Sequence, residues 1–126
     1  MNKSLPNRAI EWRDQKLILL DQRMLPGVVE FMEINSVSDA FSAIKDMVVR
    51  GAPAIGITSA YAVVLSALSN RHSDFDDACA AIEQDIKTLA QARPTAVNLR
   101  WALERMQKCL HSQTHDCVNA LEKEAI

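Results

Sequence analysis

The chain has 126 residues, of which 48% are hydrophobic and 24% charged, with a formal net charge of −2. This length fits one compact domain, and this composition excludes intrinsic disorder. Lysines and arginines are scattered rather than gathered in a stripe, so nucleic acid is not an expected partner. The three cysteines lack a Cys-x-x-Cys spacing and the chain does not open on an apolar signal-peptide core, so we expect reduced thiols and a cytoplasmic location.

Short strands are predicted in the first third of the sequence. The runs Ala9–Trp12 and Lys16–Leu20 are separated by a polar segment, and Pro26-Gly27 supplies a turn before Val28–Ile34. The last run alternates, although neither of its faces is purely apolar. We predict a small antiparallel sheet of two or three strands within residues 1–34.

The remainder, residues 36–126, is predicted to be a bundle of about five helices, so the fold class is α+β. Serine followed three residues later by an acid forms a capping box, and proline suits the first position of a helix. The predicted starts are the Ser36–Asp39 box, Pro53, the Ser73–Asp76 box, Pro94 and the segment Thr114–Asp116.

Apolar residues recur at helical spacing and mark one buried face on each of four helices. Between Gly51 and Asn70 no residue is charged, but alanines and hydroxyl residues dilute this stretch, which favours the central helix of a bundle over a membrane span. The predicted core faces are Val37, Phe41, Ile44 and Val48; Phe75, Cys79, Ile82, Ile86 and Leu89; Leu99, Leu103, Met106 and Leu110; and Val118, Leu121 and Ala125.

The segment Arg50-Gly51-Ala52-Pro53 combines a guanidinium with a helix start. A helix that begins at Pro53 leaves its first N–H groups without partners inside the helix, and its dipole is positive there. Gly51 and Ala52 are small enough to let an anion reach the backbone, and Arg50 adds a charge that suits phosphate. The alternative is an ordinary turn between helices, with Gly51 as a left-handed cap and Arg50 on the surface.

Arg93-Pro94 repeats this pattern at the fourth predicted helix. If the second and fourth helices pack side by side, the two starts would converge on one anion. The alternative is a surface arginine in a loop. We expect Trp101, within the fourth helix, to be a core or interface residue rather than a platform for a ligand.

Other kinds of site have weaker support. His111 and His115 have the spacing of metal ligands on a helix, but the residues between them break the helix and a third ligand is lacking, so we expect no metal. Cys79 and Cys109 lie at or beside core faces and are expected to be packing residues. Ser-His-Asp sets, Walker motifs and dinucleotide fingerprints are absent from the sequence, which therefore offers anion-binding elements without catalysts.

Four segments occur in an order that is found in one known family. They are Ile10-Glu11-Trp12, Leu20-Asp21-Gln22, Val49–Ile57 with Ala60-Tyr61 after it, and Arg93–Leu99 with Trp101-Ala102-Leu103 after it. Together they resemble the N-terminal signatures of the methylthioribose-1-phosphate isomerase family, which is related to the alpha, beta and delta subunits of translation initiation factor 2B. The resemblance covers nearly the whole chain. It departs at Arg100, where the family usually has an aromatic residue.

The resemblance implies an aldose–ketose isomerase that converts S-methyl-5-thioribose 1-phosphate to S-methyl-5-thioribulose 1-phosphate in methionine salvage, without a cofactor. It assigns the substrate phosphate to Arg50, Gly51, Ala52 and Arg93. The catalytic cysteine and aspartate of the family lie in a Rossmann-like C-terminal domain that this sequence lacks, and none of its cysteines matches that position. Residues 1–126 would then be an N-terminal domain that is inactive alone, partnered by its own C-terminal domain in a full-length homodimer.

Two alternatives remain at this point. The first is a non-catalytic regulatory module that resembles the initiation factor 2B subunits and binds a sugar-phosphate or nucleotide-like effector, or only partner subunits. The second is a helical interaction domain without a small ligand.

Overall fold

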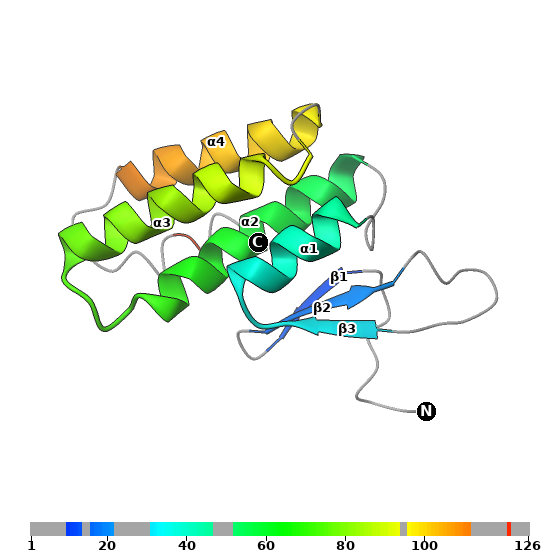
Figure 1. Cartoon of the computed structure of the whole chain (residues 1–126), viewed down its shortest axis with the longest axis horizontal. Coiled ribbons are helices and arrows are strands. Elements are labelled where there is room, and N and C mark those ends of the chain that lie inside the picture. Colours follow the sequence, from blue (N-terminus) through cyan, green and yellow to red (C-terminus); the bar gives the residue numbers. More distant parts are fainter. Residues whose placement is uncertain are drawn as a thin grey trace.

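A three-stranded sheet and four helices make up the described part of the chain (Figure 1). This computed structural model describes residues 10–13, 16–21, 31–46, 52–93, 96–111 and 121. In chain order the elements are β1 (Ile10–Arg13), β2 (Lys16–Leu20), β3 (Phe31–Ile34), α1 (Val37–Lys45), α2 (Ala52–Ser69), α3 (Phe75–Ala90) and α4 (Val97–His111). The predicted α+β class is confirmed.

The sheet is antiparallel throughout, with strand order β1-β2-β3. Leu17 of β2 lies opposite Trp12 on one side and Ile34 on the other. Leu17, Leu19 and Ile34 are fully buried, because alternate residues of a strand point to the same face and this face is covered by helices. The contacts of α2 with β1 and β2, and of α1 with β3, identify the covering helices.

The two predicted capping boxes have different outcomes. Ser36 caps α1: its Oγ accepts a hydrogen bond from the Asp39 amide at 3.1 Å, which confirms the first box. The second box is wrong, because α3 begins at Phe75 and its N-cap is Asp74, without a side-chain capping bond. The Ser73 amide instead donates to the Asn70 carbonyl at 3.1 Å, so Ser73 belongs to the turn that follows α2.

The core lies around α2, which contacts each of the other three described helices and the sheet. The prediction of a central helix is confirmed, and over residues 62–67 this helix is buried on all sides. The four residues of the predicted α4 face are also buried. On α1 and α3 the buried face is shifted toward small residues, with Ala40, Ala43 and Ala78 buried while Phe41 and Cys79 are half-buried.

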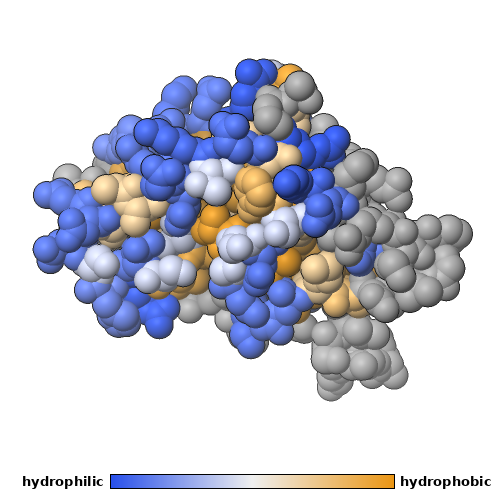
Figure 2. Space-filling model, viewed as in Figure 1, coloured by the Kyte–Doolittle hydropathy of each residue, from blue (hydrophilic) through white to orange (hydrophobic). Residues whose placement is uncertain are grey.

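The predicted fifth helix falls outside the described residues apart from Leu121, which is helical and fully buried in the core. Val48 of the predicted α1 face also lies outside them. None of the described helices combines the length and the apolarity that crossing a membrane requires. In Figure 2 the side chains over one face of the molecule are mostly hydrophilic, and apolar side chains show between the helices.

Candidate functional site

The starts of α2 and α4 lie at the same end of the helix bundle (Figure 1). The two helices run in the same direction and touch near their N-termini. A Cβ atom added at Gly56, in the second turn of α2, would lie 3.4 Å from the Asn98 carbonyl oxygen and 3.7 Å from the Ala102 Cβ. The side-by-side packing on which a shared anion site depends is therefore present.

The two helix starts differ in charge from those of the other helices. The first turn of α1 contains Asp39, and that of α3 contains Asp76 and Asp77, which compensate the positive ends of their helix dipoles. The first turns of α2 and α4 contain no acidic residue. This pair of adjacent helix starts consequently keeps its positive electrostatic potential, as an anion-binding site requires.

The predicted site residues are placed only in part. Ala52 is the first residue of α2, so the predicted start near Pro53 is confirmed to within one residue, whereas Arg50 and Gly51 lie outside the described residues. Arg93 is half-buried in the bend that follows α3. The structure therefore places the α2 start and the segment before α4, which carries Arg93, at the same end of the bundle, and the phosphate contacts of the four residues stay a prediction.

The predicted start of α4 at Pro94 is wrong, because the helix begins at Val97. The Ala96 amide donates to the Arg93 carbonyl at 2.9 Å, which closes a turn before the helix. The Ala96 carbonyl then accepts from the Arg100 amide at 3.3 Å, and this bond begins the helical pattern. Arg93 therefore lies one turn before α4 rather than directly at its first residue.

An aromatic pair that the sequence did not predict joins the sheet to α2. The rings of Trp12 and Tyr61 stack with centroids 4.7 Å apart and planes inclined by 12°. Both residues belong to the segments that carried the family resemblance, but only the tertiary structure shows that they meet. The stack holds α2 on the sheet one turn beyond Ile57, and so it supports the position of the α2 start.

A hydrogen bond from a buried serine to a half-buried aspartate joins α2 to α3. The Ser66 hydroxyl is fully buried and donates to Asp85 Oδ2 at 2.5 Å, while Asn70 Nδ2 donates to the Ser66 carbonyl at 2.8 Å. Neither contact lies near the helix starts. The Ser66–Asp85 bond fixes the far half of α2 relative to α3, and the Asn70–Ser66 bond closes the C-terminal end of α2.

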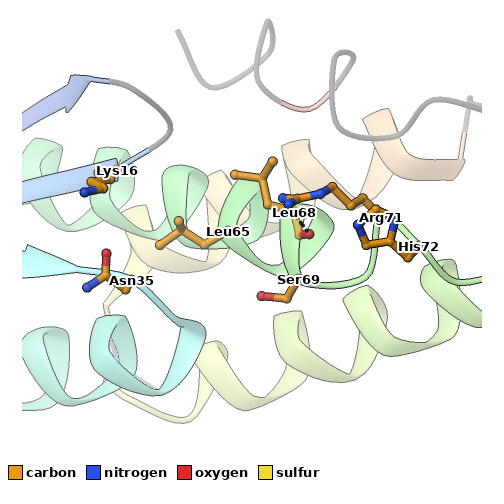
Figure 3. Close-up of a pocket in the computed structure, with 7 residues that line it drawn as sticks. All are labelled: Lys16, Asn35, Leu65, Leu68, Ser69, Arg71 and His72. Atoms are coloured by element: carbon orange, nitrogen blue, oxygen red, sulfur yellow. Dashed lines mark hydrogen bonds between the residues drawn. The ribbon is translucent and has the colours of Figure 1, made fainter.

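A cavity of about 440 Å³ lies at the opposite end of α2 from the helix starts (Figure 3). The negative end of the α2 dipole disfavours an anion there. Two of its cationic groups are also engaged, since Lys16 pairs with Glu33 at 3.3 Å and Arg71 donates to the Leu68 carbonyl at 3.4 Å. The cavity is lined by Lys16, Asn35, Leu65, Leu68, Ser69, Arg71 and His72.

The remaining candidates from the sequence do not form a second site. Cys79 and Cys109 are half-buried and pack against the core, as predicted. His111 of α4 contacts Glu83 Oε1 of α3, while His115 lies outside the described residues. Over the described ranges, the structure contains no cluster of three or more histidine, cysteine, aspartate or glutamate side chains that would hold a metal ion.

Curated proteins with similar sequences are methylthioribose-1-phosphate isomerases. The chain is 51% identical to the methylthioribose-1-phosphate isomerase of Azotobacter vinelandii over 121 residues, which are 94% of this chain and 34% of that protein. It is 50% identical to the enzyme of the same name from Pseudomonas aeruginosa, again over 94% of this chain and 34% of the relative. The chain thus spans about a third of the length of these relatives.

Solved structures share the fold. The crystal structure of 5-methylthioribose 1-phosphate isomerase from Pyrococcus horikoshii matches with a TM-score of 0.84 and 31% identity, over 95% of this chain and 36% of that one. The translation initiation factor eIF-2B subunit delta from A. fulgidus matches with a TM-score of 0.88 and 34% identity, over 94% and 35%. Residues 48–126, which include α2, α3 and α4, match the model of the initiation factor 2 subunit family. The chain therefore belongs to the initiation factor 2 subunit family, and its similarity to methylthioribose-1-phosphate isomerases extends over nearly its whole length.

Proposed function

We propose that this chain is the N-terminal, phosphate-anchoring part of an aldose–ketose isomerase that converts S-methyl-5-thioribose 1-phosphate to S-methyl-5-thioribulose 1-phosphate in methionine salvage. The observation that carries the proposal is the pair of adjacent α2 and α4 starts without acidic residues in their first turns. The choice of substrate is supported by the methylthioribose-1-phosphate isomerases that are 50–51% identical to this chain.

The proposed anchor works through charge and backbone geometry. A phosphate monoester would accept hydrogen bonds from amides at the α2 start, including that of Ala52, and the guanidinium groups of Arg50 and Arg93 would neutralise it. Gly51 leaves room for the phosphate to approach the backbone. Holding the phosphate fixes the position of the neighbouring carbons, between which the carbonyl group moves, so the anchor contributes by orienting the substrate.

The reacting groups are assigned to the part of the full-length protein that this chain does not include. We therefore expect residues 1–126 to bind the sugar phosphate without isomerising it, and the full-length protein to act as a cytoplasmic homodimer without a cofactor. Membranes and nucleic acids are not among the expected partners.

A regulatory module is the second candidate, and the match to the eIF-2B delta subunit favours it. Such a module would use the same helix starts to bind a phosphorylated effector, or would contact only partner subunits. Turnover of methylthioribose 1-phosphate by the full-length protein separates the two functions. Binding without turnover in the full-length protein would refute the enzyme and leave the regulatory module.

The anchor itself is tested by titrating methylthioribose 1-phosphate into the chain and its variants in a calorimeter. We expect Arg50→Ala and Arg93→Ala each to weaken binding by about 1.5–3 kcal/mol, or roughly 10- to 150-fold in Kd, as the loss of a charged hydrogen bond does. Arg71→Ala is the matched control, because Arg71 is exposed at the opposite end of α2. Unchanged affinity in both site variants would reject the anchor.

A further inference from the structure

Three large apolar side chains are exposed in the described part of the chain, and all three lie on α2 and α4. Ile57 is 45% exposed, Val97 is 43% exposed and Trp101 is 66% exposed. The exposure of Trp101 also shows that it is not a core residue of this chain. We call these three residues the α2–α4 apolar face.

The three side chains point to the same side of the helix pair. Val97 and Trp101 are four residues apart, so they lie one above the other on α4. Gly56 of α2 faces Asn98 and Ala102 of α4. Ile57 follows the contact residue Gly56 on α2, whereas Val97 and Trp101 each precede a contact residue on α4. Each step along a right-handed helix turns the side chain by about 100° in the same sense. In two parallel helices, one step forward from the contact on the first and one step back on the second therefore point to the same side of the pair.

The same side of α2 is covered farther along the helix. Val64 follows Ile57 by seven residues, which returns it to the same stripe of the helix, and it is fully buried. Tyr61, between them, is half-buried under its stack with Trp12. This side of α2 is therefore covered from Tyr61 onward, and it is open at Ile57, next to the proposed anchor.

Exposed charged residues flank the α4 part of the α2–α4 apolar face. The exposed residues of α4 around it include Arg100, Glu104 and Lys108. An apolar patch with a polar rim is typical of an interaction surface rather than of surface exposed singly. Tryptophan in particular is enriched at the centre of such surfaces.

We propose that the α2–α4 apolar face is the surface on which the rest of the full-length polypeptide packs. The relatives and the solved structures carry this fold unit within chains about three times as long, so each of them contains further polypeptide outside the matched part. The face adjoins the helix starts, where that occupant would bring its reacting groups to an anchored substrate. The inference rests on the proposed function in one respect, namely that this chain is part of such a longer protein.

The fluorescence of Trp101 tests the proposal. The sequence contains two tryptophans, so a Trp12→Phe background isolates the signal of Trp101. The fluorescence of Trp101 is compared between two chains. The first is the 126-residue chain, and the second joins the same residues to the part of the Azotobacter vinelandii relative that lies outside the matched region. We expect emission at long wavelength and strong acrylamide quenching in the short chain, and emission at shorter wavelength with most of the quenching lost in the longer one.

A second probe shows whether the change is local. In a Trp12→Phe, Trp101→Phe background, Lys87→Trp places a tryptophan on the exposed side of α3. Its quenching should be equal in the two chains. Trp101 quenching that stays equal in both chains would overturn the proposal. Shielding of Trp101 in the short chain, with a dimer mass by light scattering, would also overturn it and assign the face to a second copy.

Failure of this inference is distinguishable from failure of the proposed function. Isomerisation is measured on the same longer chain. Shielding of Trp101 without turnover would support the packing surface and refute the enzyme. Turnover with Trp101 still open to acrylamide would support the enzyme and refute the packing surface.

Discussion

Replacing Gly56 tests how closely α2 and α4 approach at the proposed anchor. A Cβ atom at this position would meet the Asn98 carbonyl oxygen at 3.4 Å, the Ala102 Cβ at 3.7 Å and the Asn98 Cβ at 3.9 Å. These are ordinary van der Waals distances, so an alanine fits without moving either helix. Any larger side chain has to place further carbon atoms into a space that Asn98 and Ala102 already fill.

The two substitutions should therefore change stability in opposite directions. Glycine inside a helix costs about 1 kcal/mol relative to alanine, so Gly56→Ala should raise the free energy of unfolding by about that amount. Gly56→Val adds two methyl groups beyond the Cβ, and overpacking of this kind costs about 1–3 kcal/mol. We expect the valine variant to be less stable than the parent and to bind the phosphate ester more weakly, because α4 is pushed away from the α2 start.

Urea denaturation followed by circular dichroism at 222 nm measures both effects, and calorimetric titration measures the phosphate affinity. A change of 1 kcal/mol in a chain of this size should also move the melting temperature by about 4 °C. If Gly56→Ala destabilised the chain by more than about 1 kcal/mol, the helices would have to be closer than the structure places them. A valine variant as stable as the parent would show the contact to be absent.

Two further predictions concern contacts that hold the bundle together. Ser66→Ala should lower the free energy of unfolding by about 1.5–3 kcal/mol, because Asp85 loses a charged hydrogen bond in a part-buried position. If the double variant Ser66→Ala, Asp85→Ala lost as much stability as the two single variants together, the two residues would not be coupled. Ser36→Ala should cost about 1 kcal/mol through loss of the α1 cap. Asp74→Ala should cost clearly less in the same urea assay, since Asp74 makes no side-chain capping bond, and equal losses would contradict the assignment of the two caps.

Much of the candidate site was predictable from the sequence because its elements are local. The start of α2 follows from small residues and a proline at adjacent positions, and the absence of acids from the first turns of α2 and α4 can be read directly from the chain. The exact start of α4 was not predictable, because a turn closed by the Arg93 carbonyl and the Ala96 amide delays the helix to Val97. The pattern that places proline first in a helix carries no information about such a turn.

The sequence by itself determined the α+β class, the order of the described elements, the α4 core face and the family resemblance, since these depend on periodicity and on short motifs. Only the tertiary structure decided that α2 and α4 run parallel in contact at Gly56, that Trp12 stacks on Tyr61 and that Ser66 bonds to Asp85. It also decided that Trp101 is exposed rather than buried. The physical reason is that each of these outcomes depends on which helix faces which neighbour, and helical spacing marks an apolar side without naming the partner that covers it.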